Sequence, residues 1–344
     1  MALVAFASSK GSPGATTAAL AIGALWPRPV VVAECDTAGS DIAIRMPALD
    51  GGVLDADRGL VTLAAAGRRG LRSDLLLSHT QQVIGGLDVL VGLRVPEQAA
   101  GIGNMWPQLG SIFDGLQGYD VLADLGRCGA QTPQNALMRS ARLLVMVCDT
   151  EPSSVVHLRE RINVLARDLD PANPHGVPIA VMVVADPKKK REAVREVFAA
   201  LDQMDVPISY KWVLAWDPQG AQIFAGAVTG RPDRTALVRS ARQVAGDLSR
   251  AVAPFFVPAD QPYDAWPQQE AEGEWHMQVE PQPWQQPHLA ESEGRPAGQP
   301  ADSVPPPPPP PPPPEHDEAG PPTEPRHYYH AASPEDDQQG VRHD

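Results

Sequence analysis

The N-terminal stretch constrains the fold of this chain most strongly. An apolar run at residues 2–7 leads into a small polar turn that begins at Ser9, and an alanine-rich run at residues 16–25 follows it. A strand, a glycine turn and a helix in this order direct backbone N–H groups and the positive end of a helix at one place, where phosphate binds well. The sequence therefore predicts an α/β fold with an anion site at its first turn.

That turn departs from the P-loop pattern Gly-x-x-x-x-Gly-Lys-Ser/Thr at two positions. Ser9 stands where the first glycine is expected and Ala15 stands where the lysine is expected, while Gly14 and Thr16 keep the pattern. A lysine on the phosphates neutralises charge that builds up in the transition state, and such contacts are worth several kcal/mol. A change of about 1.4 kcal/mol alters a rate tenfold. If this turn binds a nucleotide, we therefore expect its hydrolysis to be roughly a thousandfold slower than with a lysine at position 15.

Apolar runs alternate with helical patterns along residues 1–253. Strands are predicted at residues 2–8, 30–33, 87–91, 119–126, 143–148, 179–184 and 206–214. Helices are predicted at residues 16–25, 60–66, 96–116, 153–169, 190–201, 218–227 and 235–252. The strand runs are almost continuously apolar, which is typical of parallel strands covered on both faces. We predict a doubly wound, mostly parallel sheet of about seven strands with helices on both faces.

Composition divides the chain after residue 253. Residues 254–344 are rich in Pro, Glu and Gln, contain a run of prolines at 305–314, and have too few aliphatic residues to bury a core. We predict a disordered tail there, whose prolines and aromatics are either solvated or docking motifs for a protein partner. The formal net charge of −14 belongs to this part, because residues 1–256 carry equal numbers of acidic and basic residues.

The three cysteines and the hydropathy pattern indicate the compartment. Cys35, Cys128 and Cys148 lie in or beside apolar runs and have no metal-ligand spacing, which favours reduced core residues in a cytoplasmic protein. Residues 1–344 contain no apolar run of about 18 residues, so neither a membrane span nor a secretory signal is expected.

Acidic residues stand at the ends of two predicted strands. Glu34 and Asp36 follow the second strand, and Asp124 lies near the end of the strand predicted at residues 119–126. Ligands of open α/β sheets bind at the carboxyl ends of the strands, so these acids are predicted to converge on the first turn. Alternatively, Asp36 bonds only to nearby backbone N–H groups and Asp124 caps the following helix, and Glu34 is expected to be a cap rather than a catalytic residue.

The ordered set of motifs resembles the ParA/MinD family of deviant Walker A ATPases, within the SIMIBI class. Residues 30–40 resemble that family's second acidic motif, residues 119–126 look like its Walker B strand, and residues 216–221 resemble its late base-contacting segment. The first turn resembles Lys-Gly-Gly-x-Gly-Lys-Thr-Thr with the residues Lys10, Gly11, Ser12, Pro13, Gly14, Ala15, Thr16 and Thr17. The stretch 86–92 and the altered turn are similar to the divergent bacterial branch of CpaE/TadZ-like proteins.

This resemblance implies a domain at residues 1–253 that binds ATP and Mg²⁺ and forms a nucleotide-dependent homodimer. It assigns Lys10 to the signature lysine that reaches the phosphates of the partner subunit, and Asp36 to the catalytic acid. It assigns Mg²⁺ to Thr16, Asp36 and Asp124. The implied nucleotide contacts are Lys10, Gly11, Ser12, Pro13, Gly14, Ala15, Thr16, Thr17, Asp217 and Pro218.

Several functions are compatible with these residues. The leading hypothesis is a nucleotide switch that positions a partner assembly, such as the chromosome or plasmid partitioning apparatus or a pilus or secretion machine. Ala15 also allows a pseudo-ATPase scaffold that works without nucleotide. Gly11 and Gly14 followed by Glu34 superficially fit an NAD(P)-binding oxidoreductase, although the Gly-x-Gly-x-x-Gly spacing is missing. Nonspecific DNA binding is possible but not favoured, because the domain is neutral and the tail acidic.

Overall fold

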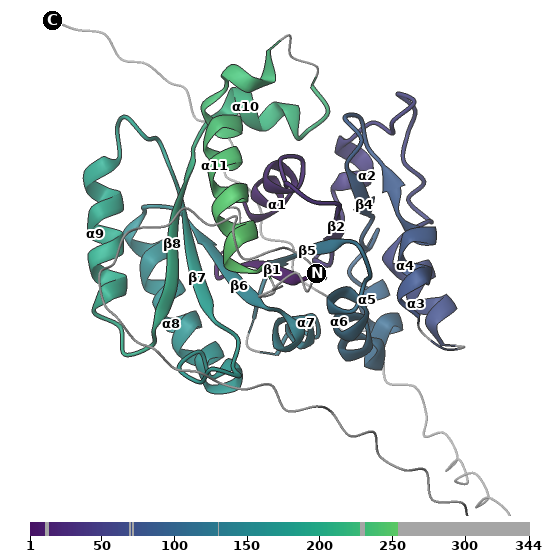
Figure 1. Cartoon of the computed structure of the whole chain (residues 1–344), viewed down its shortest axis with the longest axis horizontal. Helices are drawn as coiled ribbons and strands as arrows, with labels where there is room; N and C mark the ends of the chain where they lie inside the picture. Colours follow the sequence, from purple (N-terminus) through teal and green to yellow (C-terminus); the bar gives the residue numbers. More distant parts are fainter. Residues whose placement is uncertain (11–13, 69, 71, 130, 228–230, 254–344) are drawn as a thin grey trace, which may run out of the picture. The chain divides into compact units, whose positions relative to one another are not determined.

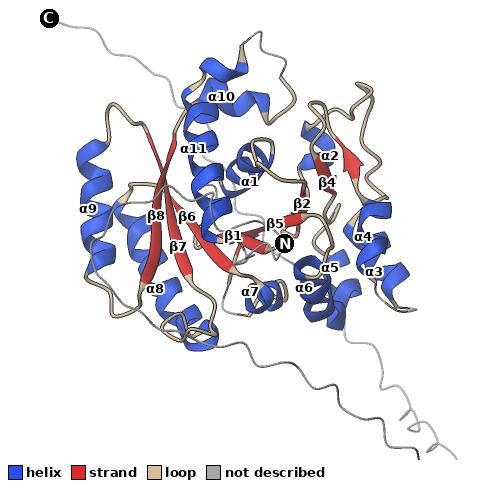
Figure 2. Ribbon diagram, in the orientation of Figure 1, coloured by secondary structure: helices blue, strands red, loops and turns tan. Residues whose placement is uncertain are grey.

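The computed structural model describes residues 1–10, 14–68, 70, 72–129, 131–227 and 231–253. Their strands are β1 (Leu3–Ser8), β2 (Val30–Glu34), β3 (Gln81–Gln82), β4 (Asp88–Leu90), β5 (Asp120–Arg127), β6 (Leu143–Cys148), β7 (Ile179–Ala185) and β8 (Ile208–Ala215). Figures 1 and 2 show these strands as one twisted sheet between two layers of helices.

The helices include several that are long and several of a single turn or two. They are α1 (Ala15–Gly23), α2 (Ile42–Arg45), α3 (Leu60–Gly67), α4 (Ser73–His79), α5 (Gln98–Ile102), α6 (Trp106–Asp114), α7 (Asn135–Ser140), α8 (Pro152–Leu169), α9 (Arg191–Asp202), α10 (Pro218–Ile223) and α11 (Ala236–Ala251). Two 3₁₀ turns, η1 (Gly103–Met105) and η2 (Pro232–Arg234), complete the described elements.

The eight strands lie in the order β3-β4-β2-β5-β1-β6-β7-β8. All pairings in the described sheet are parallel except that of β3 with β4. The predicted doubly wound, mostly parallel sheet is confirmed. The strand beyond the predicted seven is β3, whose two residues are too few to give a hydrophobic period.

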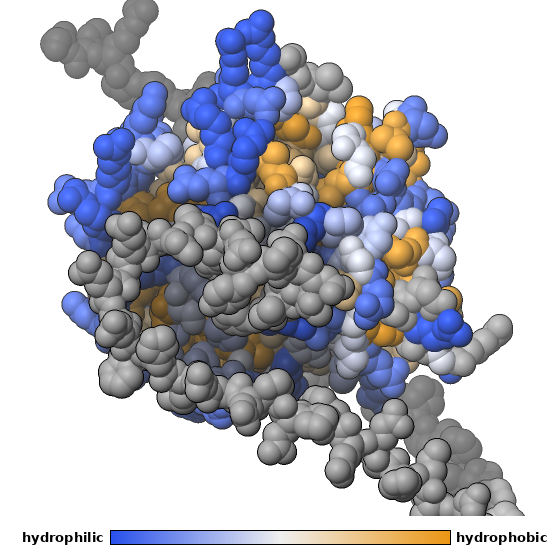
Figure 3. Space-filling model, in the orientation of Figure 1, coloured by the Kyte–Doolittle hydropathy of each residue, from blue (hydrophilic) through white to orange (hydrophobic). Residues whose placement is uncertain are grey.

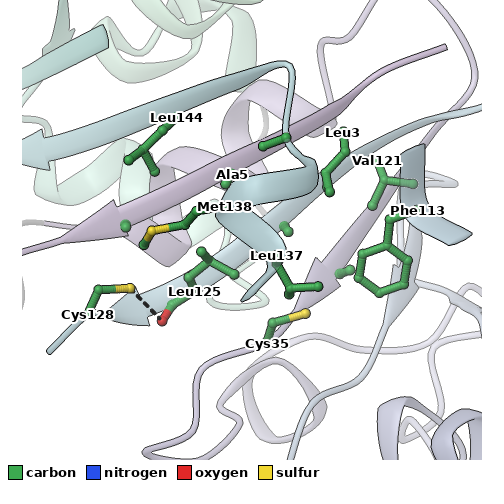
Figure 4. Packing of buried hydrophobic residues seen from close by; sticks show 14 of the residues in the cluster. Leu3, Ala5, Cys35, Phe113, Val121, Leu125, Cys128, Leu137, Met138 and Leu144 are labelled. Carbon is green, nitrogen blue, oxygen red and sulfur yellow. Dashed lines mark hydrogen bonds between the residues drawn. The ribbon is translucent and has the colours of Figure 1, made fainter. Parts of the chain in front are cut away.

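The two faces of the sheet carry two separate cores. In β1, Leu3 and Ala5 face a cluster that includes α3 to α9, while Val4 and Phe6 face a cluster with α1, α2 and α11. Alternate side chains of a strand point to opposite faces, so a strand covered on both sides reads as continuously apolar. Figure 4 shows part of the first core, where side chains of β1, β5, α6 and α7 surround buried cysteines.

All three cysteines are buried and free. Burial raises the pKa of Cys128, which leaves its thiol protonated and unreactive at neutral pH. The prediction that the cysteines are reduced core residues is confirmed.

Three helix predictions need correction. The single helix predicted at 96–116 is divided into α5, η1 and α6, because Gly103 has a positive φ of 48° at the break. The short helices α2, α4 and α7 were not predicted, since four to seven residues hold too little periodicity. The helix predicted at 153–169 begins one residue earlier, at Pro152, and Glu151 is its N-cap residue.

Apolar side chains also reach the surface. Figure 3 shows them over α2 and β4, and Ile44 and Val53 are 84% and 87% exposed. None of the helices in the described ranges combines the length and apolarity that a bilayer crossing requires. The predicted tail at 254–344, with its prolines at 305–314, lies outside the described residues.

Candidate functional site

The first turn connects β1 to the N-terminus of α1. Gly14 is the N-cap residue of α1 and has a φ of 90°, a left-handed conformation that a side chain disfavours. No side chain in the described part of the chain caps this helix, and its first turn carries no acid. The positive end of α1 is therefore not compensated by its own residues, which suits an anion. The predicted contacts Gly11, Ser12 and Pro13 lie outside the described residues.

Asp124 lies beside this turn, in the strand between β1 and β2. Its side chain is fully buried, and its Oδ1 accepts a hydrogen bond of 3.0 Å from the Gly126 N–H. Its Oδ2 is also buried and has no hydrogen-bond partner among the described residues. A buried carboxylate oxygen without a donor costs free energy, so the arrangement favours a proton or a cation at this atom.

The surroundings of Asp124 change its protonation. Burial raises the pKa of Asp124 to about 7, and the nearby Thr16 hydroxyl and the Gly126 N–H only partly oppose this effect. The negative charges of Glu34 and Asp36 add to the rise in pKa. Asp124 therefore titrates near neutral pH, where a bound cation easily displaces its proton.

Asp36 reaches the same point from β2. Its Oδ1 accepts a hydrogen bond of 2.8 Å from the Ala38 N–H, as the alternative of a turn acid predicts. Its Oδ2 lies against Gly126, where a Cβ atom would overlap it, and Gly126 has a φ of 58°. Burial raises the pKa of Asp36, which the Ala38 hydrogen bond partly opposes. The structure therefore brings Asp36 and Asp124 together at the carboxyl end of the sheet.

Glu34 has a structural role. Its Oε1 accepts hydrogen bonds from the N–H groups of Asp41 (2.8 Å) and Ile42 (3.2 Å) at the start of α2, and its Oε2 accepts from the Ser40 hydroxyl and the Gly92 N–H. Burial raises the pKa of Glu34, and these four bonds oppose it. Both oxygens are used, so Glu34 holds the loop after β2 in place, as the prediction of a cap implied.

A cavity of about 80 Å³ adjoins the first turn. Four of the predicted nucleotide contacts line it, namely Gly14, Thr17, Asp217 and Pro218. Its other walls are mainly apolar and include Val184, Leu214, Trp216 and Leu237. The fold thus joins the first turn and the late segment, which are about 200 residues apart in the chain and are predicted to hold the two ends of one nucleotide.

The Asp217 carboxylate is occupied by the protein itself. Oδ1 accepts from the Gly220 N–H (3.0 Å), and Oδ2 accepts from the N–H groups of Ala236 (2.7 Å) and Leu237 (3.2 Å). Burial alone would raise the pKa of Asp217, but these backbone donors and that of Gln219 outweigh it and lower the pKa. Asp217 fixes the starts of α10 and α11. It therefore contributes to the cavity by holding these two helices, whose residues line it, in place.

Lys10 lies apart from this group. Its Nζ donates a hydrogen bond of 3.3 Å to the Ser153 hydroxyl near the start of α8. It lines a different pocket from the one beside Gly14. Ala15, at the position of the missing lysine, is the buried first residue of α1. The structure therefore presents no lysine beside the Asp36 and Asp124 carboxylates among the residues it describes.

The chemistry of these side chains fits a cation that arrives with a phosphate. Mg²⁺ is usually held by one or two carboxylates together with phosphate oxygens and water. Asp124, Asp36 and the Thr16 hydroxyl supply that type of donor, and the orphaned Oδ2 of Asp124 needs one. Within the described ranges, no group of three His, Cys, Asp or Glu side chains forms a complete metal site by itself. Thr16, Asp36 and Asp124 are therefore suited to share Mg²⁺ with a ligand.

Sequence reasoning missed the part played by Gly126. This glycine both donates to Asp124 and leaves room for Asp36. The signal that could have identified it is its position two residues after Asp124, near the end of a predicted strand. Asp36 was already expected at the same edge of the sheet, so a residue without a side chain was needed there.

Comparison with known proteins identifies the fold. No family model and no curated protein sequence matches the chain. A ParA family ATPase from Chlorobium tepidum TLS superposes with a TM-score of 0.55 at 15% identity, over 71% of this chain and 98% of the other. The cell division ATPase MinD of Pyrococcus furiosus gives 0.53 at 18% identity, over 72% and 98%. Septum site-determining MinD of Pyrococcus horikoshii OT3, complexed with Mg-ADP, gives 0.52 at 18%, over 72% and 96%. The chain has the fold of the ParA/MinD-type ATPases.

The strand order argues against the dinucleotide-binding alternative. In that fold the strand with the ribose-binding acid lies directly beside the first strand, in the order 3-2-1-4-5-6. Here β5 lies between β1 and β2. Glu34, the acid proposed for the ribose, also has both oxygens bonded to its own loop and to Gly92.

Proposed function

We propose that this chain is a ParA/MinD-like nucleotide-binding protein that acts in the cytoplasm as a switch or scaffold for a partner assembly. The observation that carries the proposal is the Oδ2 of Asp124 in β5, which is buried and has no hydrogen-bond partner among the described residues. A fold that keeps an unsatisfied carboxylate beside an uncapped helix N-terminus is suited to bind a cation and a phosphate together. The solved MinD complexed with Mg-ADP supports this choice of ligand.

Each residue then has a task. The Gly14 turn and the start of α1 bind the phosphates of ATP, and the cavity beside Trp216 receives the base. Mg²⁺, when bound, neutralises phosphate charge, and Thr16, Asp36 and Asp124 are the residues that would hold it. Asp36 also orients the attacking water. Because Ala15 contributes no charge, we expect the chain to retain nucleotide binding while hydrolysis is slow or lost.

The signature lysine acts between subunits in this proposal. Lys10 is turned toward Ser153 and away from the carboxylates of its own chain, which is compatible with a role at the phosphates of a second copy. Nucleotide would then favour a homodimer, and the dimer would recruit the partner with the help of the Pro-rich tail.

The resemblance to the CpaE/TadZ-like branch supports pilus or secretion machinery as one kind of partner. We propose either chromosome or plasmid partitioning or a pilus or secretion machine as the partner assembly. Nonspecific DNA binding is less favoured, because two of the arginines in the last helix are paired with acids, the first being Arg242 with Asp233 at 2.6 Å. Arg250 likewise pairs with Asp247.

Titration of the purified full-length chain with ATP, with and without Mg²⁺, tests the proposal. We expect Mg²⁺-dependent binding, turnover that is slow or absent, and a rise in turnover on Ala15→Lys. Lys10→Ala is expected to abolish nucleotide-dependent dimerisation in sedimentation, whereas the control Lys189→Ala, at an exposed lysine, leaves it intact. Absence of binding at millimolar ATP would overturn the nucleotide switch.

A nucleotide-independent scaffold is the second candidate, and Ala15 is the observation that favours it. In that case the fold positions its partner by surface contacts alone. Pull-down of the partner assembly with and without ATP separates the two, since only the switch predicts a nucleotide-dependent yield.

A further inference from the structure

A second, larger pocket is lined by Lys10 and is distinct from the cavity beside Gly14. Its volume is about 390 Å³, and Lys10, Arg127, His157, Glu160 and Arg161 line it. Lys10 follows β1, Arg127 ends β5, and the other three come from one face of α8. The two pockets share no lining residue. A volume of this size is in the range of small-molecule sites.

The charges of this pocket are unbalanced. Lys10, Arg127 and Arg161 make no ion pair with any described residue, and the hydrogen bond that Lys10 donates goes to a neutral hydroxyl. The pocket's acid, Glu160, already faces His157, with 3.6 Å between its Oε2 and the imidazole Nδ1. The pocket therefore presents three cations and a single carboxylate.

Neighbouring arginines behave differently. Arg139 of α7 pairs with Asp168 at 3.1 Å, and Arg142 pairs with Asp114 at 3.2 Å. Arginines on this side of the sheet thus form ion pairs with nearby acids, whereas Lys10, Arg127 and Arg161 form none with the described residues.

Arg161 provides an independent sign of a ligand. Its Nε is buried and has no hydrogen-bond partner among the described residues. A buried N–H without an acceptor is costly, and the protein offers it none. A guanidinium matches two oxygens of a phosphate with parallel hydrogen bonds, which a lysine does not do.

We propose that this pocket binds the phosphate groups of a small phosphorylated ligand through Arg161, Arg127 and Lys10. The ligand oxygens satisfy the orphaned Nε, and two or three negative charges balance the three cations. The phosphate comes either from a free phosphorylated compound or from a nucleotide carried by a second copy of this chain. The inference shares Lys10 with the proposed function, whereas Arg127 and Arg161 have no task in that function, so variants of these two arginines test the pocket separately.

Titration calorimetry of the full-length chain with inorganic pyrophosphate tests this site. We expect saturable binding by the natural chain and a loss of at least tenfold in affinity in Arg161→Gln and in Arg127→Gln. Arg139→Gln, which removes an ion-paired arginine, is the matched control and is expected to keep the affinity. Arg161→Lys keeps the positive charge but lacks the paired N–H donors of a guanidinium, so an intermediate affinity is expected. Thermal unfolding verifies that each variant is folded.

Other outcomes overturn the proposal. No binding at about 1 mM pyrophosphate, equal binding by the natural chain and Arg161→Gln, or equally tight binding of citrate would each contradict a phosphate site. Loss of pyrophosphate binding in Asp124→Asn but not in Arg161→Gln would place the anion at the first turn instead. If Asp124→Asn fails to bind ATP but keeps pyrophosphate, the two sites are separate.

The source of the phosphate is decided by sedimentation of the same variants. If a second copy supplies it, Arg161→Gln loses dimerisation by ATP as well as pyrophosphate binding. If a free compound supplies it, pyrophosphate binds the monomer and the dimerisation by ATP is unchanged in Arg161→Gln.

Discussion

Two aspartates on the same strand show how one residue type serves two purposes. Asp120 begins β5 and Asp124 lies further along it, toward the carboxyl end, and both are buried, at 2% and 0% exposure. Asp120 accepts hydrogen bonds of 2.8 Å from the Ala2 N–H, the Trp26 indole and the Arg28 guanidinium. Asp124 accepts one backbone N–H and has the Thr16 hydroxyl nearby, and its Oδ2 has no hydrogen-bond partner within the described ranges.

The difference follows from the end of the strand on which each acid lies. At the amino end of β5, Arg28 bonds both Asp120 and the Ser249 carbonyl near the end of α11, so the charge is matched and the elements are tied together. At the carboxyl end, where ligands bind in open sheets, the charge of Asp124 is left unmatched. A fully bonded buried acid stabilises a fold, whereas a partly bonded one indicates a site for something else.

The largest expected effect is that of Asp120→Ala. This change leaves the Arg28 charge and the Trp26 indole N–H without their acceptor, so we expect a loss of about 3–5 kcal/mol in the free energy of unfolding. Urea unfolding measures it. The matched change, Asp124→Asn, is expected to leave stability within about 1 kcal/mol or to raise it. Equal losses in both variants would remove the distinction between the two acids.

Next in size is Gly126→Ala. A side chain at a φ of 58° is strained, and its Cβ would overlap the Asp36 carboxylate, so we expect a loss of about 1–3 kcal/mol together with weaker Mg²⁺-nucleotide binding. Gly246→Ala is the control, since a Cβ there meets only Arg250 at 3.6 Å within α11. That change is expected to stabilise by about 0.5–1 kcal/mol. A Gly126→Ala chain as stable as the natural one would contradict the assigned packing.

The pH dependence of stability is expected to be opposite to that of a bonded acid. Burial raises the pKa of Asp124 from 3.8 to about 7, so the folded chain holds a proton there that the unfolded chain has lost. Stability from this group is complete below about pH 4 and falls as pH rises toward 7, by up to about 1.4 kcal/mol per pH unit. The difference in unfolding free energy between the natural chain and Asp124→Asn, measured from pH 4 to 8 without Mg²⁺ or nucleotide, isolates it. A difference that does not vary with pH would show that Asp124 is ionised throughout.

The smallest expected effect on stability is that of Lys10→Ala. The lysine donates one exposed hydrogen bond to Ser153, so thermal unfolding is expected to change by less than about 0.5 kcal/mol. A larger loss would make Lys10 a structural residue and weaken its proposed role between subunits.

Local sequence patterns account for the parts of this molecule that were predicted correctly. The strands read as long apolar runs because both faces of the sheet are covered, and the acids Asp36 and Asp124 stood out because they end such runs. The order of the strands, with β5 between β1 and β2, depends on pairing across distant parts of the chain. No local pattern encodes that order.

Side-chain roles were harder to predict than positions. Asp217 lines the predicted cavity, but its carboxylate is used by Gly220, Ala236 and Leu237, and the last two are far along the chain. Arg127 and Arg161 were not recognised, because their pocket forms only when β5 and α8 pack together. The spacing of His157, Arg161 and Val164 on one face of α8 was the available signal.

The most direct test of the central claim is titration calorimetry of the full-length chain and of Asp124→Asn with a non-hydrolysable ATP analogue, at saturating Mg²⁺ and in EDTA. We predict that the natural chain binds the analogue more tightly with Mg²⁺, and that Asp124→Asn loses this Mg²⁺ dependence while remaining folded. Equal Mg²⁺ dependence in the two proteins, or no binding by the natural chain at millimolar analogue, would contradict the claim that Asp124 is left unpaired to hold a metal ion.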